Sequence, residues 1–421
     1  MTTTINNEHK KLNVPNLRFP EFKGEWEMIK VSDLLDFYST NSLSWEQLDY
    51  NNGKIKNLHY GLIHKGLPTM VDVAYDSLPY IKEEFMLKSF TLLKEGDVAF
   101  ADASEDTNDV AKAIEVVNCN NQQIVSGLHT IHGRDNSNRT VIGYKGYAFA
   151  SDSFHKQIRR IAQGTKVFSI SVRNFDEVYI GIPSKEEQTK ISKLLTAIDK
   201  RIATQNKIIE RYESLIRGLN DSLYAQYGDD ILTSFSSIGL SYSGLSGKSA
   251  QDFGCGKPYI TYLNVYSNNI INEKDFQYVV IKEGEKQNVV EHGDVLFTLS
   301  SETPEEVGIG SVYLGNENVY LNSFCFGIHI INTKIAFPPY LSYYVSSTPF
   351  RKFIYPYAQG STRFNLCKAD FEKASIKLPS LENQKRIYSI LSRIESKTET
   401  EKSLLDLYNS QKQYLLRQMF I

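Results

Sequence analysis

Two stretches of the chain carry many lysine and arginine side chains and almost no carboxylates. Residues 136–175 include a single acidic residue, Asp152, and residues 318–369 include none. Because the formal net charge of the whole chain is −2, this positive charge is local rather than general. Local positive charge is typical of a face that binds a polyanion, and phosphate contacts dominate affinity for nucleic acids. Chance clustering on a strand-rich surface is the alternative.

Each basic stretch contains a glycine loop, AQGTKVFSI at residues 162–170 and AQGSTRFNL at residues 358–366. Glycine permits close approach of a backbone, and hydroxyl groups can donate hydrogen bonds to phosphate. A plain β-turn is the competing interpretation. We predict phosphate contacts from these loops and from nearby cations: Lys156, Arg159, Arg160, Gly164, Thr165, Lys166, Arg351, Lys352, Gly360, Ser361, Thr362 and Arg363.

A second pair of segments combines polar and aromatic side chains. Residues 60–65 correspond to residues 262–266, and residues 103–106 correspond to residues 300–303. Each segment follows a β-like run, which predicts loops at strand ends, where such side chains can read base edges in the major groove. The candidates for this role are His64, Lys65, Ser104, Asn264, Ser300 and Ser301.

Catalytic motifs are absent from the sequence. The segment Ser246–Ser249 ends like a phosphate-binding loop, but Tyr242 stands where that motif needs glycine. Pro338-Pro339-Tyr340 follows Phe337 rather than the amide or acid of an amino-methyltransferase loop, and no His-Glu-x-x-His occurs. Paired carboxylates lie in charged, surface-like stretches. We therefore expect a chain that is not an enzyme and holds no metal or cofactor of its own.

These candidate residues occur in two copies because the chain is duplicated. Gln163 and Gln359 are 196 residues apart, and the same offset relates Phe175 to Phe371 and Gln188 to Gln384. A repeat of this length exceeds the ~20–50 residues of a solenoid unit, so it is a duplicated domain with its connector. Two similar modules present two similar surfaces, which suits a ligand with two sites.

Each copy ends in a long helical pattern that begins after a proline. Apolar residues recur in steps of four and three, the spacing of a coiled-coil seam. The first seam comprises Ile191, Leu195, Ile198, Ile202, Gln205, Ile209, Tyr212, Ile216, Leu219 and Leu223. The second comprises Ile387, Leu391, Ile394, Thr398, Glu401, Leu405, Tyr408, Lys412, Leu415 and Met419. We expect the two helices to pair with each other, antiparallel, in preference to packing each on its own domain.

The predicted fold class is α+β, with two mixed β-rich recognition domains joined by two long antiparallel coiled-coil helices in a pseudo-two-fold repeat. The predicted boundaries are an N-terminal arm at 1–25, domains at 26–183 and 228–379, and helices at 184–227 and 380–421. The four cysteines are isolated, which favours reduced thiols and a cytoplasmic location. Since no apolar run approaches the ~18 residues of a membrane span, no membrane association is expected.

The combined pattern resembles the specificity subunit of type I restriction–modification systems. The resemblance rests on the two Ile/Leu-Pro-x-x-x-x-x-Gln helix entries at Pro183 and Pro379, the Gln-Gly-Thr/Ser loops and the Gly-Asp-Val-x-Phe segments. The opening Pro15-Asn16-Leu17-Arg18-Phe19-Pro20, followed by Trp26, also matches. It covers nearly the whole chain.

This resemblance implies that each domain reads one half of a split double-stranded DNA target and that the helix pair sets the unread gap. It also implies two modification subunits that use S-adenosylmethionine to methylate adenine. Motor-nuclease subunits that use ATP and Mg would join for restriction. A stand-alone nucleic-acid-binding module and a structural coiled-coil adaptor are the alternatives.

Overall fold

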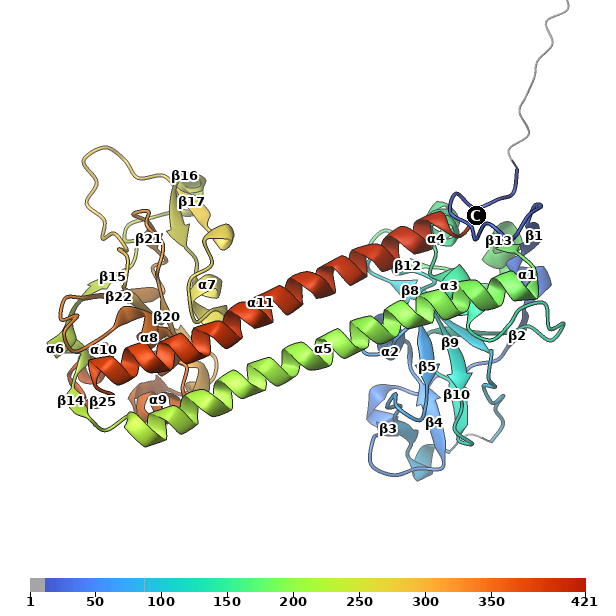
Figure 1. Cartoon of the computed structure of the whole chain (residues 1–421). Helices are drawn as coiled ribbons and strands as arrows, with labels where there is room; N and C mark the ends of the chain where they lie inside the picture. The colour runs from blue at the N-terminus through green and yellow to red at the C-terminus, as the bar shows by residue number, and fades with distance from the viewer. Residues whose placement is uncertain (1–11, 87) are drawn as a thin grey trace, which may run out of the picture. The chain divides into compact units, whose positions relative to one another are not determined.

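The structure is a computed structural model that describes residues 12–86 and 88–421. The chain divides into two compact units: unit 1 comprises residues 1–205 and 404–421, and unit 2 comprises residues 206–403. Two long helices, α5 (Lys185–Tyr227) and α11 (Leu381–Gln418), each contribute one end to each unit (Figure 1). The two long helices and the mixed α+β class were both predicted from the sequence, and the class is confirmed.

Unit 1 is built on a five-stranded sheet of order β2-β11-β7-β9-β5 and a four-stranded sheet of order β10-β4-β6-β3. Its strands are β1 (Glu27–Lys30), β2 (Asp36–Tyr38), β3 (Leu48–Asp49), β4 (Ile55–Leu58), β5 (Met70–Asp72), β6 (Tyr80–Ile81), β7 (Val98–Ala101), β8 (Ala103–Ser104), β9 (Ala113–Asn118), β10 (Gln123–Ser126), β11 (Thr130–Arg134), β12 (Phe168–Ser169) and β13 (Tyr179–Ile182). Its short helices are α1 (Val31–Leu34), α2 (Tyr60–His64), α3 (Tyr144–Phe149) and α4 (Asp152–Ile161).

Unit 2 is built on sheets of order β15-β22-β18-β20, β17-β16-β21 and β19-β24-β23. Its strands are β14 (Ile231–Thr233), β15 (Gly239–Ser243), β16 (Phe253–Ile260), β17 (Gln277–Val279), β18 (Val295–Thr298), β19 (Ser300–Ser301), β20 (Gly310–Val312), β21 (Tyr320–Leu321), β22 (Cys325–Ile330), β23 (Ala358–Gly360), β24 (Phe364–Leu366) and β25 (Ile376–Leu378). Its short helices are α6 (Phe235–Ile238), α7 (Tyr262–Ser267), α8 (Pro338–Tyr344), α9 (Thr348–Ile354) and α10 (Lys368–Lys373).

The sheet topology repeats between the units. The antiparallel order β2-β11-β7-β9 of unit 1 recurs as β15-β22-β18-β20 in unit 2. The entry and exit strands pair in both copies, β1 with β13 and β14 with β25. Even the parallel pairing of β10 with β4 has its counterpart in β21 with β16. The sequence repeat is therefore a repeat of the fold.

The long helices run antiparallel within each unit. In unit 1, the carboxylate of Asp199 in α5 forms an ion pair with Lys412 of α11 at 2.7 Å. Nη1 of Arg201 in α5 lies 3.4 Å from the hydroxyl oxygen of Tyr408 in α11. In unit 2, Lys402 of α11 lies 3.3 Å from Glu213 of α5. These pairs explain one interruption of the second seam, because the lysine at position 412 faces a carboxylate of the partner helix.

The apolar seam also packs on the domain cores, which the sequence analysis did not favour. In unit 1, Leu195 belongs to one buried cluster with Phe100 and Phe175 of the domain and Leu415 of the partner helix. In unit 2, Leu391 is buried with Phe297 and its domain neighbours. Thr398 is also buried, and its hydroxyl donates to the carbonyl of Ile394. At each end, the apolar seam of a long helix therefore packs against both a domain core and the other long helix.

The described part of the N-terminal arm is fixed on unit 1, whereas residues 1–11 of the predicted arm lie outside the described residues. Arg18 forms a two-pronged ion pair with the buried carboxylate of Glu187, with both N–O distances 2.7 Å. The amide of Leu17 donates to Gln418, and Trp26 packs edge-to-face on Phe420. This contact set accounts for the arm motif. The predicted domain boundaries stay predictions.

Candidate nucleic-acid interface

Strand pairing brings the two kinds of predicted loop together in each unit. In unit 1, β8 pairs with β12, so Ser104 lies opposite Phe168 beside the first glycine loop. In unit 2, β19 pairs with β24, and Ser301 lies opposite Phe364 beside the second glycine loop. Segments about 60 residues apart in the sequence thus form one face in each copy.

Both glycine loops are tight hairpins whose backbone conformation requires glycine at the first position of the turn. Gly164 and Gly360 both have φ near +146°, a conformation that side chains rarely adopt. A Cβ atom at Gly164 would lie 1.9 Å from the carbonyl oxygen of Val167, and one at Gly360 would lie 2.1 Å from that of Arg363. The loop tips, residues 165–167 and 361–363, are exposed.

The hairpin geometry sets which loop residues correspond. Because the carbonyls of Val167 and Arg363 occupy the same place against their glycines, Arg363 is the counterpart of Val167. Lys166 then corresponds to Thr362. The two cations that the sequence analysis treated as equivalent phosphate contacts thus occupy different positions on the loop.

In unit 1 a chain of aromatic and imidazole rings borders this face. Tyr60 contacts His59, His64 and His129, with ring centroids 4.7, 5.9 and 5.2 Å apart. His129 lies 3.2 Å from the carboxylate of Asp102, and His64 lies 3.0 Å from the carbonyl of Ala103. Burial, and secondly the neighbouring charge of His129, lower the pKa of His59.

In unit 2 the equivalent border is built from different side chains. Tyr262 and Tyr266 stack at 6.0 Å, and the hydroxyl of Tyr262 donates to the carbonyl of Ser300. The carboxylate of Glu306 accepts hydrogen bonds from Tyr266 at 2.7 Å and from Ser301 at 3.0 Å. These two bonds lower the pKa of Glu306, which keeps a negative charge at the edge of the face.

The predicted site residues divide by exposure. The exposed ones are Lys65, Lys156, Arg159, Arg160, Gly164, Thr165, Lys166, Lys352, Gly360, Ser361, Thr362 and Arg363. Of these, Lys156 and Arg159 pair with Asp152, and Arg159 also reaches Asn108. His64 and Ser104 are half-buried. The exposed group is accessible to a ligand, and its role as ligand contacts stays a prediction.

Four predicted residues are engaged inside the fold. Arg351 donates to the carbonyl oxygens of Glu305, Val307 and Gly308, each at 2.7 Å, and burial lowers its pKa to about 10. Asn264 is buried and bonds Asn272 through its amide. Ser300 and Ser301 are buried in strand β19. These side chains support the face rather than form it, because their polar atoms already have partners in the protein.

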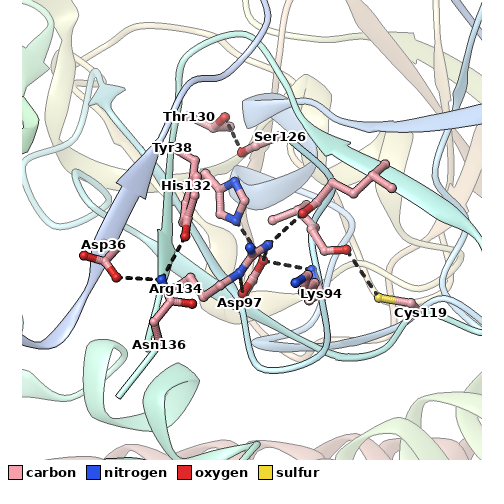
Figure 2. Close-up of polar contacts among 12 residues, drawn as sticks. Asp36, Tyr38, Lys94, Asp97, Cys119, Ser126, Thr130, His132, Arg134 and Asn136 are labelled. Atoms are coloured by element: carbon pink, nitrogen blue, oxygen red, sulfur yellow. Dashed lines mark hydrogen bonds and ion pairs between the residues drawn. The ribbon is translucent and has the colours of Figure 1, made fainter. Parts of the chain in front are cut away.

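A pair of buried aspartates holds the strands beneath the two faces. Figure 2 shows Asp97 accepting from Nε2 of His132 at 2.8 Å, from Arg134 at 2.7 and 2.8 Å, and from the amide of Lys94 at 2.8 Å. Burial would raise the pKa of Asp97, but these hydrogen bonds together outweigh it and the pKa is lowered. The Gly-Asp-Val-x-Phe motif is thus a structural element of the strand start.

The second copy of this motif has the opposite electrostatic balance. Asp294 accepts from His329 at 2.9 Å and from Tyr242 at 2.6 Å, but no arginine bonds it in the part of the chain that the structure describes. Burial therefore prevails and the pKa of Asp294 is raised. The two copies keep the geometry of the motif and differ in the direction in which the pKa of its aspartate is shifted.

Comparison with known families decides the identity of this duplicated fold. A family model described as "Type I restriction modification DNA specificity domain" matches residues 23–214 and 246–407, which is most of the chain. The chain belongs to this family. A comparison with curated proteins finds no match.

Solved structures from type I restriction–modification systems share the fold of this family member. The type I restriction–modification S subunit from M. genitalium aligns with a TM-score of 0.51 at 15% identity, covering 97% of this chain and 99% of that one. A chain from a structural study of complex assembly and conformational transition of the type I restriction–modification system aligns with a TM-score of 0.58 at 14% identity, covering 93% and 96%. At such low identity, these structural likenesses show the fold alone.

Residues 12–86 and 88–421 contain no group of His, Cys, Asp and Glu side chains arranged to hold a metal ion. Within the same ranges, no helix is both long and apolar enough to cross a membrane. The four cysteines are free.

Several residues on the two faces of this family member escaped sequence reasoning. Asp102 and His129 in unit 1, and Glu306 and Phe324 in unit 2, border the faces but carry no motif. His129 and Phe324 are structural counterparts. The carbonyl of His129 accepts a hydrogen bond from the backbone amide of Asp102, the residue before β8. The carbonyl of Phe324 accepts one from the backbone amide of Leu299, the residue before β19. Only strand pairing reveals this equivalence, so no signal in the sequence could have found it.

Proposed function

We propose that this chain is the DNA sequence-recognition subunit of a type I restriction–modification complex. It reads a bipartite double-stranded target with one domain per half-site. Modification subunits then methylate adenine with S-adenosylmethionine, and motor-nuclease subunits that use ATP and Mg restrict unmodified DNA. The chain itself is non-catalytic and acts in the cytoplasm.

The observation that carries this proposal is the contrast between what the two copies share and what they do not. The strand pairing of β8·β12 and β19·β24, the glycine hairpins and the buried aspartates recur. The side chains on the faces differ, with His64, His129 and Val167 replaced by Tyr266, Phe324 and Arg363. A constant scaffold with variable faces is what two readers of different half-sites require.

The positive charge of the basic stretch in unit 1 favours DNA over a protein ligand. In unit 1, the exposed cations of α4 and of the hairpin tip, Arg160 and Lys166, lie in one basic stretch. Phosphate contacts of this kind position a reader on the duplex, while base contacts specify the sequence.

The test is methylation sequencing of genomic DNA from the source strain with and without this gene. We expect loss of methyladenine at one split motif and at no other. A stand-alone binder or a coiled-coil adaptor would leave the methylation pattern unchanged. The purified chain alone should transfer no methyl group, whereas the complex with its modification subunits should do so only at the split motif.

A further inference from the structure

The side chain of Arg363 is held in place beside the recognition face of unit 2. Its Nη2 donates to Oγ of Ser300 at 3.3 Å, and its guanidinium lies 5.9 Å from the ring centroid of Phe324. Both supports are themselves fixed or placed by strands, since Ser300 is buried in β19 and Phe324 directly precedes β22. Arg363 thus has a preferred orientation although it is exposed.

The guanidinium retains donors for a ligand. Only one of its N–H groups is used by Ser300 among the hydrogen bonds of the described residues, and the guanidinium is planar with several donors in a fixed fork. Such a fork fits O6 and N7 of guanine in the major groove, the commonest specific contact between arginine and DNA. We infer that Arg363 reads a guanine in the half-site bound by unit 2.

The rest of the face agrees with base reading rather than backbone contact. Phe324 is 56% exposed and offers an apolar surface beside the guanidinium. The carboxylate of Glu306, held by Tyr266 and Ser301, adds an acceptor that a phosphate would repel. A face that combines an oriented arginine, an aromatic ring and a carboxylate suits base edges better than a chain of phosphates.

The first copy offers an internal contrast. At the position of Arg363 the hairpin of unit 1 carries Val167, which is 52% exposed and cannot donate. A residue that contacts the backbone should be a hydrogen-bond donor in both copies, as the counterparts Lys166 and Thr362 are, because every half-site has phosphates. A residue that reads one base is needed only where that base occurs. The guanine contact is therefore specific to unit 2.

The inference rests on the proposed function and is tested in the complex with the modification subunits. Arg363→Lys keeps the positive charge but loses the planar two-pronged fork, so it preserves the charge of a phosphate contact and weakens the contact to O6 and N7 of guanine. We expect the variant complex to bind DNA with an unchanged salt dependence and to lose roughly 5- to 150-fold in discrimination at one G·C pair. Lys373→Ala removes an exposed cation of α10 outside the predicted contacts and should keep the full discrimination.

A substituted target identifies the base. Replacing the guanine by 7-deazaguanine removes its N7 acceptor, which should weaken methylation by the wild-type complex and leave the Arg363→Lys complex little affected. The inference is overturned if Arg363→Lys methylates the wild-type motif with full discrimination, or if the relaxed position is an A·T pair or lies in the half-site of unit 1. A wild-type complex that methylates no specific motif would instead overturn the proposed function.

Discussion

Gln188 and Gln384 make the same three hydrogen bonds in the two units. The side-chain oxygen of Gln188 accepts from the amide of Val141 at 2.8 Å, and its nitrogen donates to the carbonyls of Arg139 and Pro183 at 3.1 and 2.9 Å. The side-chain oxygen of Gln384 likewise accepts from the amide of Phe337 at 2.8 Å, and its nitrogen donates to the carbonyls of Ile335 and Pro379 at 2.7 and 2.8 Å. Both side chains are fully buried. This glutamine fastens each recognition domain to the start of its long helix.

We predict that Gln188→Ala destabilises unit 1. The substitution leaves one amide and two carbonyls without their partner in a buried place, and a single unsatisfied group costs about 1–3 kcal/mol. Both tryptophans of the chain, Trp26 and Trp45, lie in unit 1, so tryptophan fluorescence during urea unfolding reports on this unit. Lys185→Ala, on the exposed side of the same first turn, is the matched control and should leave the midpoint in place. Equal midpoints for both variants would refute the anchoring role.

A second prediction concerns how the buried aspartates make stability depend on pH. Because the folded pKa of Asp97 is lowered, its stabilisation is present above the ordinary aspartate pKa of ~4 and is lost as pH falls through the folded value. Because the folded pKa of Asp294 is raised, the stabilisation that Asp294 contributes is present below a pH of ~4. It is lost as the pH rises through the folded pKa. Asp97→Asn should therefore lose stability relative to wild type as pH rises from about 3 to 5.5, and Asp294→Asn should gain it.

Urea unfolding across this pH range checks the prediction. Tryptophan fluorescence follows Asp97→Asn, and far-UV circular dichroism, which reports on both units, follows Asp294→Asn. The two difference curves should slope in opposite directions. Parallel slopes would show that Arg134 does not set the charge balance of Asp97.

Sequence periodicity anticipated the long helices, but not everything their stripes contact. The four-three spacing identified Leu195 and Leu391 as seam positions, and both are buried. Their neighbours include domain residues such as Phe175 and Phe371 as well as the other helix. Periodicity shows that a helix face is apolar but cannot say which of two apolar surfaces covers it. Lys412 illustrates the same limit, since only Asp199 on the other helix explains its place in the seam.

The loops of the candidate site were predicted from the sequence, but the surface that they form together was not. The glycine hairpins and the segments at Ser104 and Ser301 were identified from their repetition, and strand pairing joins them. Arg351 was chosen for its charge, yet its guanidinium donates to three carbonyls of a distant loop. Residue type gives the chemistry available, whereas partners far along the chain decide whether it is free to meet a ligand.

We predict that the middle of the helical seam tolerates no charge. Ile209 of α5 is buried, and Ile209→Asp would bury a carboxylate at a cost of several kcal/mol. We expect loss of solubility or of complex assembly, measured by size-exclusion chromatography of the co-expressed subunits. Ser214→Asp adds the same charge at an exposed position of the helix and should assemble normally. Normal assembly of both variants would mean that Ile209 does not belong to a buried seam.

The hairpin of unit 1 should contribute a phosphate contact. Lys166 is exposed at the loop tip, and Lys166→Ala should weaken DNA binding without changing the preferred sequence. The slope of log binding constant against log salt should fall by ~1, because one phosphate contact is lost. Fluorescence anisotropy at several salt concentrations measures this. A changed motif with an unchanged slope would assign Lys166 to a base instead.

The last prediction concerns the independence of the two readers. Exchanging residues 26–183 for the equivalent domain of another specificity subunit should change one half of the methylated motif and preserve the other half and the gap. The exchange ends at Pro183, whose carbonyl is bonded by Gln188 of the retained helix, and the incoming domain must supply the amide that Val141 gives to the same glutamine. Single-molecule methylation sequencing of the chimera reads both halves at once. Joint alteration of the two halves would show that the duplicated faces do not read separately, and the repeat would then serve another purpose, such as docking two copies of a partner.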